Sequence, residues 1–185
     1  ISLADDDMSA FEETNQTEIP EQSERSKILI AYFSCTGNTK AVAEQIATLT
    51  GGDLYEIIPA EPYSSADLNY NNSNCRANIE MNDPSSRPAI GSDSIDISEY
   101  DTVILGYPIW WSTMPRIINT FLDTYDLSGK TVLPFCTSGG SGISKSVSDI
   151  KAAEPGATVE EGLRVSGTND NHLETWLRSS GAITE

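Results

Sequence analysis

The chain has 185 residues, of which 28 are acidic and 11 are basic, so its formal net charge at neutral pH is -17. This charge argues against nucleic acid and anionic membrane surfaces as partners and favours proteins with basic surfaces, although acidity that serves only solubility explains it equally well. With three cysteines, no CxxC pair and a single histidine, the sequence predicts neither a disulfide framework nor a metal site.

Residues 1–26 are rich in acidic and small polar residues and contain few apolar ones. This composition predicts a disordered arm or linker, because it cannot bury enough apolar surface to fold alone. We expect the arm to precede a single domain at residues 27–185. Such a spacer suits an exported protein that is tethered upstream, as a lipoprotein is, and we prefer that interpretation to a cytoplasmic extension.

Apolar runs and helical patterns alternate along the rest of the chain. Continuous apolar runs predict buried strands, and apolar residues on one face predict amphipathic helices. The predicted strands cover residues 27–33, 54–58, 102–107, 131–135 and a weaker stretch at 158–165 that is interrupted by Gly162. The predicted helices cover residues 39–50, about 66–80, 115–125, 144–153 and 169–180. This alternation implies a parallel sheet with right-handed crossover connections.

The connection at residues 59–98 is longer than usual between a strand and the next element, and long connections are often functional. Tyr63, Tyr70 and Arg76 are the side chains in it that could reach a ligand. Surface positions with no role in binding are the simpler interpretation for each of them.

A short loop joins the first predicted strand to the first predicted helix. It consists of Ser34, Cys35, Thr36, Gly37, Asn38 and Thr39. A helix N-terminus has unpaired N–H groups and partial positive charge, so this loop predicts a phosphate site with short side-chain donors. Because Lys40 is the only nearby cation and the Walker pattern is absent, we expect a phosphate monoester and no magnesium triphosphate. Cys35 is either a thiol of lowered pKa or a small residue that fits the turn, and we favour the second.

The loop resembles the FMN-phosphate loop of flavodoxins, and two later loops resemble the ones that hold the isoalloxazine ring in that family. One follows the third strand and contains Pro108, Ile109, Trp110 and Trp111; the other follows the fourth and contains Thr137, Ser138, Gly139 and Gly140. The resemblance covers about residues 27–180. It implies an α/β fold of three layers, a doubly wound five-stranded parallel sheet in the order 2-1-3-4-5, with FMN at the carboxyl ends of strands 1 and 3.

The resemblance also implies roles within these loops. One indole supplies a flat apolar wall for the ring while the other packs against protein, and the sequence does not distinguish the two. Glycines in the loop after the fourth strand let backbone N–H groups approach the flavin carbonyl oxygens.

Two departures from many flavodoxins bear on function. Ser112 follows the tryptophan pair where those proteins have a glycine, which argues against strong stabilisation of the one-electron-reduced flavin. Residues 137–142 contain no aromatic residue, so the outer flavin face is either open or covered by Tyr63 or Tyr70. The sequences of the two ring-binding loops, residues 108–111 and 137–140, also resemble the flavin loops of quinone reductases built on the same fold, and an open flavin face suits hydride transfer to a substrate.

We therefore expect an FMN-binding redox protein that carries electrons through a non-covalent flavin. An FMN-dependent reductase, with NAD(P)H and a quinone as substrates, is the alternative. A third hypothesis is a flavin-free interaction module, although the donors at Ser34, Thr36 and Thr39 are all retained.

Overall fold

The computed structural model describes residues 27–138, 140–166 and 171–183, which form one parallel sheet covered by helices on both faces. The sheet runs in the order β2-β1-β3-β4-β5, and β6 also pairs with β4. The strands are β1 (Ile28–Tyr32), β2 (Asp53–Glu56), β3 (Thr102–Pro108), β4 (Thr131–Thr137), β5 (Thr158–Val159) and β6 (Leu163–Val165). The predicted fold class and strand order are thus confirmed. The expected arm at residues 1–26 lies outside the described residues, so the division into arm and domain stays a prediction.

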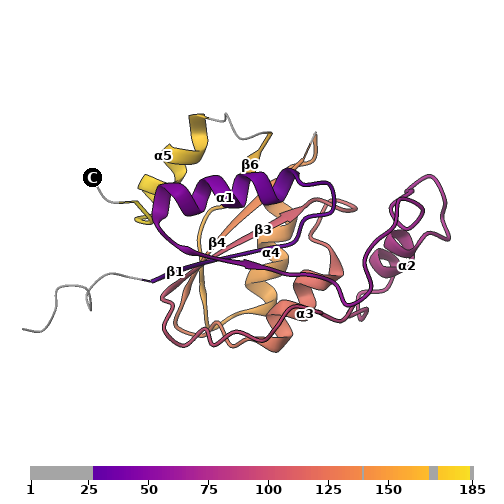
Figure 1. Ribbon diagram of the computed structural model, residues 1–185, viewed down its shortest axis with the longest axis horizontal. Helices are drawn as coiled ribbons and strands as arrows, with labels where there is room; N and C mark the ends of the chain where they lie inside the picture. Colours follow the sequence, from indigo (N-terminus) through magenta and orange to yellow (C-terminus); the bar gives the residue numbers. More distant parts are fainter. Residues whose placement is uncertain (1–26, 139, 167–170, 184–185) are drawn as a thin grey trace, which may run out of the picture.

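Figure 1 shows the helices in two layers, with one exception. The helices are α1 (Asn38–Thr50), α2 (Arg76–Asn82), α3 (Arg116–Thr124), α4 (Ser144–Ala153) and α5 (Asn171–Ser179). The first and last of these cover one face, while α3 and α4 cover the other. By contrast, α2 lies beyond the end of the sheet.

Two hydrophobic clusters follow from the alternation of side chains along buried strands. On β1, Ile28, Ile30 and Tyr32 pack in the cluster that contains the buried residues of α1 and α5. The intervening β1 residues pack in the cluster that contains the buried residues of α3. The central strands are buried on both sides, which is why they appear in the sequence as continuous apolar runs.

The weak fifth strand of the prediction is two short strands, β5 and β6, separated by residues 160–162. Opposite this gap β4 carries Pro134, which has no N–H to donate to a neighbouring strand. Gly162 fills the gap closely, since a Cβ there would lie 2.7 Å from Ile143 Cδ1 and 3.1 Å from the Pro134 carbonyl oxygen. The interruption that Gly162 indicated is real, and it divides the strand.

The helix predicted at about residues 66–80 is wrong over residues 66–75, because α2 begins only at Arg76. Before it, the side-chain oxygens of Asn69 and Asn72 accept hydrogen bonds from the backbone N–H groups of Asn71 and Asn74. Such local bonds to asparagine compete with helix formation and favour turns.

None of the helices in the described part of the chain combines the length and the apolar character that crossing a membrane requires.

Candidate functional site

The strand register brings the three predicted loops to one edge of the sheet. Tyr32 of β1 pairs with Gly106 of β3, which in turn pairs with Phe135 of β4. The loops that follow these strands therefore start side by side at their carboxyl ends. This is the position in which a doubly wound sheet binds ligands.

The first loop leaves the start of α1 open to an anion. Gly37 is the N-cap residue, with a left-handed φ of 90°, and no side chain of the described residues caps this helix. Ser34 is engaged within the loop, because its Oγ accepts a hydrogen bond from the Gly37 N–H at 3.2 Å. The first-turn N–H groups of α1 thus remain available, as a phosphate site requires.

Thr39 connects the first loop to the third. It is buried, and its Oγ1 shares a hydrogen bond of 2.7 Å with Thr137 Oγ1 at the end of β4. The two hydroxyls fix the spacing between the loops across a sequence separation of 98 residues. Thr39 is therefore a structural link as well as a candidate donor.

Cys35 is exposed as a residue, but partial burial of its thiol, partly offset by the Arg76 charge, raises the pKa of the thiol to about 11. A raised pKa means that the thiol stays protonated near neutral pH and is a poor nucleophile. The structure favours the interpretation of Cys35 as a small residue that fits the turn.

The structure distinguishes the two tryptophans. Trp110 packs inward, with its ring edge-on to Phe33 and Tyr63 at centroid distances of 5.6 and 5.3 Å. Trp111 is 55 % exposed, and its Nε1 donates to Asn78 Oδ1 at 2.8 Å. Trp111 is therefore the more exposed of the two indoles, a distinction that the sequence did not provide.

A tight turn displays Trp111. The backbone N–H of Trp110 donates to the Thr113 carbonyl at 2.9 Å, and the N–H of Thr113 donates back at 3.1 Å. Between them Trp111 and Ser112 have φ values of 50° and 66°. Turns with two positive φ values normally use asparagine and glycine, so a tryptophan followed by a serine here places the backbone under strain. Strain of this kind clusters at binding sites.

Two adjoining hollows lie over this edge of the sheet and share Thr36, Pro108 and Ile109. The first, of about 470 Å³, we call the aromatic hollow; its other walls include Leu68, Tyr70, Ala77, Asn78, Trp110 and Trp111. The second, of about 650 Å³, we call the polar hollow; its other walls include Asn38, Thr137, Ser138, Arg164 and Ser166. Both volumes lie in the range of ligand pockets.

The predicted site residues are distributed unevenly between the hollows. Cys35 and Thr39 line the aromatic hollow with the tryptophans, whereas Asn38, Thr137 and Ser138 line the polar one. Gly37 and Gly140 are not among the lining residues, although Gly140 donates its N–H to Ser138 Oγ at 3.2 Å. Gly139 lies outside the described residues.

Arg164 is a residue that the sequence interpretation missed. It lies on β6 opposite Cys136, and its Nε donates to the Ser138 carbonyl at 3.3 Å. Among the described residues it supplies the one cation that lines either hollow, and no carboxylate lines them. Such a lining accepts an anion even in a strongly acidic protein. The sequence signal was weak: an arginine in a short strand that ends at the same edge.

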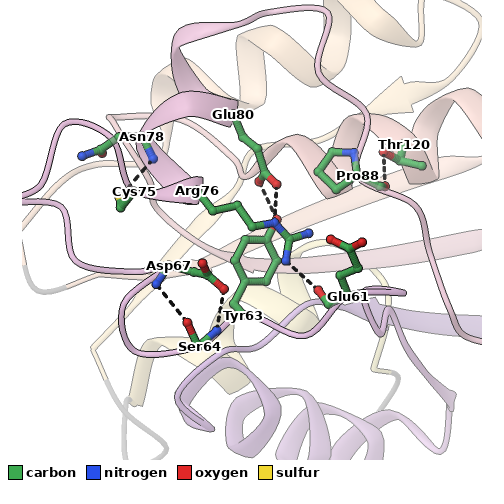
Figure 2. Close-up of polar contacts among 10 residues, drawn as sticks. All are labelled: Glu61, Tyr63, Ser64, Asp67, Cys75, Arg76, Asn78, Glu80, Pro88 and Thr120. Carbon is green, nitrogen blue, oxygen red and sulfur yellow. Dashed lines mark hydrogen bonds and ion pairs between the residues drawn. The ribbon is translucent and has the colours of Figure 1, made fainter.

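The long connection holds the three side chains that the sequence indicated could reach a ligand, and Figure 2 shows two of them, Tyr63 and Arg76. Arg76 lies over the Tyr63 ring at 3.9 Å, and its Nε donates to Glu80 Oε1 at 2.8 Å. Tyr63 donates its hydroxyl to the other Glu80 oxygen, and burial together with that bond raises the pKa of Tyr63 far above its usual value. Tyr63 and Arg76 are thus held within the protein, while Tyr70 is exposed and lines the aromatic hollow.

Taken together, these residues suit a phosphate monoester joined to a planar apolar ring. The open α1 N-terminus provides backbone donors, and the exposed indole of Trp111 provides a flat wall. No group of three or more His, Cys, Asp or Glu that could hold a metal ion occurs in the part of the chain that the structure covers.

The chain resembles known proteins over most of its length. The sequence profile of the flavodoxin family matches residues 27–180. A Bacteroides eggerthii protein described as a flavoprotein is 50% identical, with a TM-score of 0.80 over 84% of this chain and 98% of that one. A similar protein from Bacteroides uniformis is 42% identical, with a TM-score of 0.79 over 83% of this chain and 98% of that one.

A third solved structure is a flavoprotein of Lactobacillus acidophilus in complex with FMN. It is 29% identical, with a TM-score of 0.67 over 82% of this chain and 99% of that one. The chain matches no curated protein.

Proposed function

Because this chain belongs to the flavodoxin family, we propose that it binds FMN without a covalent bond and carries electrons between partner proteins. The observation that carries this proposal is the uncapped N-terminus of α1, which lies beside hollows that Trp111 and the β3–α3 loop line. The FMN complex of the similar Lactobacillus acidophilus protein supports the choice of ligand.

The residues of this chain divide the binding task. Backbone N–H groups at the start of α1, with Thr36 and Asn38, would hold the phosphate, and Gly37 allows the chain to turn there. Trp111 and Ile109 would hold the ring. When bound, FMN supplies one-electron or two-electron chemistry, and the protein binds it, orients it and tunes its potentials.

The partners in this proposal are redox proteins with basic surfaces. The formal charge of -17 produces a long-range field that attracts such proteins and repels acidic ones. Association with them weakens as salt increases, because the Debye length shortens to about 8 Å at physiological ionic strength.

A second candidate, an FMN-dependent reductase, is favoured by the aromatic hollow. This space of about 470 Å³ adjoins the phosphate loop, and one of its walls is the 77 % exposed Tyr70. It has room for a planar acceptor such as a quinone or the nicotinamide of NAD(P)H. The two functions require the same cofactor and differ in the number of electrons transferred at a time.

Stepwise anaerobic reduction of the FMN-loaded protein, followed by visible absorption, tests the proposal. An electron carrier is expected to show a broad long-wavelength band of half-reduced flavin before full reduction. Direct conversion to fully reduced flavin, together with catalysed NAD(P)H-to-quinone turnover, would favour the reductase. Protein that stays colourless in excess FMN would contradict both functions and leave the interaction module.

Substitution of each tryptophan tests which indole holds the ring. Trp111→Ala is expected to raise the Kd for FMN about tenfold, because it removes the exposed ring and its stacking of roughly 0.5–1.5 kcal/mol as well as buried apolar area. Trp110→Phe is the comparison at the other indole, since it keeps an aromatic ring against Phe33 and Tyr63 in the same hollow. It should change the Kd less than about twofold and lower the free energy of unfolding by about 1 kcal/mol. Fluorescence titration and urea unfolding measure the two quantities, and the opposite ranking would identify Trp110 as the wall.

A further inference from the structure

Residues 63–82, which we call the α2 lobe, lie between β2 and β3 in the chain and at the carboxyl end of the sheet in space. The lobe contributes Leu68, Tyr70, Ala77 and Asn78 to the aromatic hollow. It is therefore a wall of the candidate site, although no motif in its sequence resembles a flavin-binding loop.

Asn78 is the residue that joins the lobe to Trp111. Asn78 is only 2 % exposed, and its Nδ2 donates hydrogen bonds to the carbonyl oxygens of Tyr70 and Asn72 at 3.0 and 2.8 Å. Its Oδ1 accepts the hydrogen bond from Trp111 Nε1 at 2.8 Å. One buried amide thus holds the Tyr70 backbone and the Trp111 indole at the same time.

The chemistry of the partners fixes the orientation of this amide. Both carbonyl oxygens can only accept hydrogen bonds, so the NH₂ group must face them. The indole N–H can only donate, so the amide oxygen must face Trp111. A rotated amide, or a side chain of another type, would leave buried groups unpaired.

The rest of the lobe is attached firmly enough for Asn78 to act as a reference point. Arg116 of α3 donates to the carbonyl oxygens of Glu80 and Met81 at the end of α2, at 3.3 and 2.9 Å. Arg76 and Glu80 of α2 also hold the side chain of Tyr63, as Figure 2 shows. The Tyr63 ring in turn packs against Phe33 and Trp110, so it joins the lobe to the rest of the protein.

We propose that the α2 lobe is part of the flavin site, with Asn78 as the residue that positions the Trp111 indole and Tyr70 as a second aromatic wall for the planar ring. Tyr70 lines the same hollow as Trp111, and its side chain is 77 % exposed, so a ring bound there would cover it. This proposal rests on the proposed binding of FMN and adds the residues of the β2–β3 connection that shape its site.

The Kd for FMN, measured by quenching of flavin fluorescence, tests the wall. Tyr70→Leu is expected to raise the Kd about fivefold and to alter the visible circular dichroism of the bound flavin. Ile79→Ser is the matched control, because Ile79 is an exposed apolar residue of the same lobe that is not among the lining residues. It should leave the Kd and the dichroism unchanged.

A double-mutant cycle tests the positioning role. Asn78→Ala and Trp111→Phe are each expected to raise the Kd about fivefold to tenfold, and the double variant should be clearly less affected than the product of the two. Asn82→Ala, an exposed asparagine of the same helix, should bind FMN as the wild type does. A general loss of packing would instead give independent effects on the Kd.

The outcomes separate this proposal from the proposed function. If Tyr70→Leu and Asn78→Ala both bind FMN within twofold of the wild type, with the dichroism unchanged, the lobe is not part of the flavin site. If Tyr70→Leu raises only the KM of a quinone acceptor, the aromatic hollow binds a second substrate and this proposal is overturned.

Should Asn78→Ala fail to fold, the Tyr70 variant still tests the proposal by itself. A wild-type protein that does not bind FMN contradicts the proposed function itself.

Discussion

Gly37→Val is expected to raise the Kd for FMN at least about 100-fold, which corresponds to about 2.7 kcal/mol. Gly37 has a φ of 90° at the N-cap of α1, a conformation that a β-branched residue adopts only at a cost of about 1–2 kcal/mol. Relief of that strain turns the peptide groups of the loop away from the phosphate, and each lost hydrogen bond to a charged group costs a further 1.5–3 kcal/mol, roughly.

The Gly37 effect should be confined largely to binding, because a Cβ at this position would meet no described atom within 4 Å. Urea unfolding of the FMN-free variant is expected to show a loss of no more than about 2 kcal/mol, the strain itself. Cys35→Ala is the control in the same loop: the Cys35 thiol has a raised pKa and carries no charge near neutral pH, so the FMN affinity of the variant should stay within about threefold of the wild type. A larger loss of affinity for Cys35→Ala than for Gly37→Val would contradict the backbone account of the phosphate site.

Gly106→Ala is expected to lower the free energy of unfolding by about 3 kcal/mol, a large share of the 5–15 kcal/mol that stabilises most domains. A Cβ at Gly106 would lie 2.1 Å from Phe135 Cζ, and 2.5 and 2.7 Å from the two Cε atoms. The Phe135 ring is completely buried among the residues under α1 and α5, so it has no free space into which it can move. Urea unfolding of the purified variant measures this loss.

A second substitution identifies the cause of the Gly106 effect. Adding Phe135→Leu to the Gly106→Ala variant should restore part of the lost stability, because leucine lacks the ring atoms that clash with the new Cβ. Gly142→Ala is the control glycine, because a Cβ there would meet no described atom within 4 Å and its φ is not left-handed. If the double variant is less stable than the sum of the single changes predicts, the clash is not the reason.

The sequence pattern of adjacent residues was sufficient to predict the buried strands and the phosphate loop, because both are formed by residues close together in the chain. The apolar runs that became β1, β3 and β4 are buried on both faces, which is why they were evident. The phosphate loop was equally evident, because a strand, a glycine and a helix start are adjacent in the chain.

The parts that were missed depend on contacts between distant residues. The roles of Asn78, Arg164 and the two tryptophans follow from partners 26–77 positions away, which no local pattern reveals. The early start predicted for α2 was wrong because the prediction took no account of the side-chain hydrogen bonds of Asn69 and Asn72, which favour turns. Likewise, the split of the fifth strand depends on Pro134 in the adjacent strand.

The strained turn at Trp111 and Ser112 has a consequence for the speed of binding. The indole is fixed both by the turn and by the Asn78 amide before any ligand arrives. Because Trp111 needs no rearrangement before it contacts a ligand, its part of the site does not slow association below diffusional encounter. The encounter itself is between two anions, a phosphate ester and a protein of formal charge -17, so long-range repulsion slows it in dilute buffer and added salt relieves it.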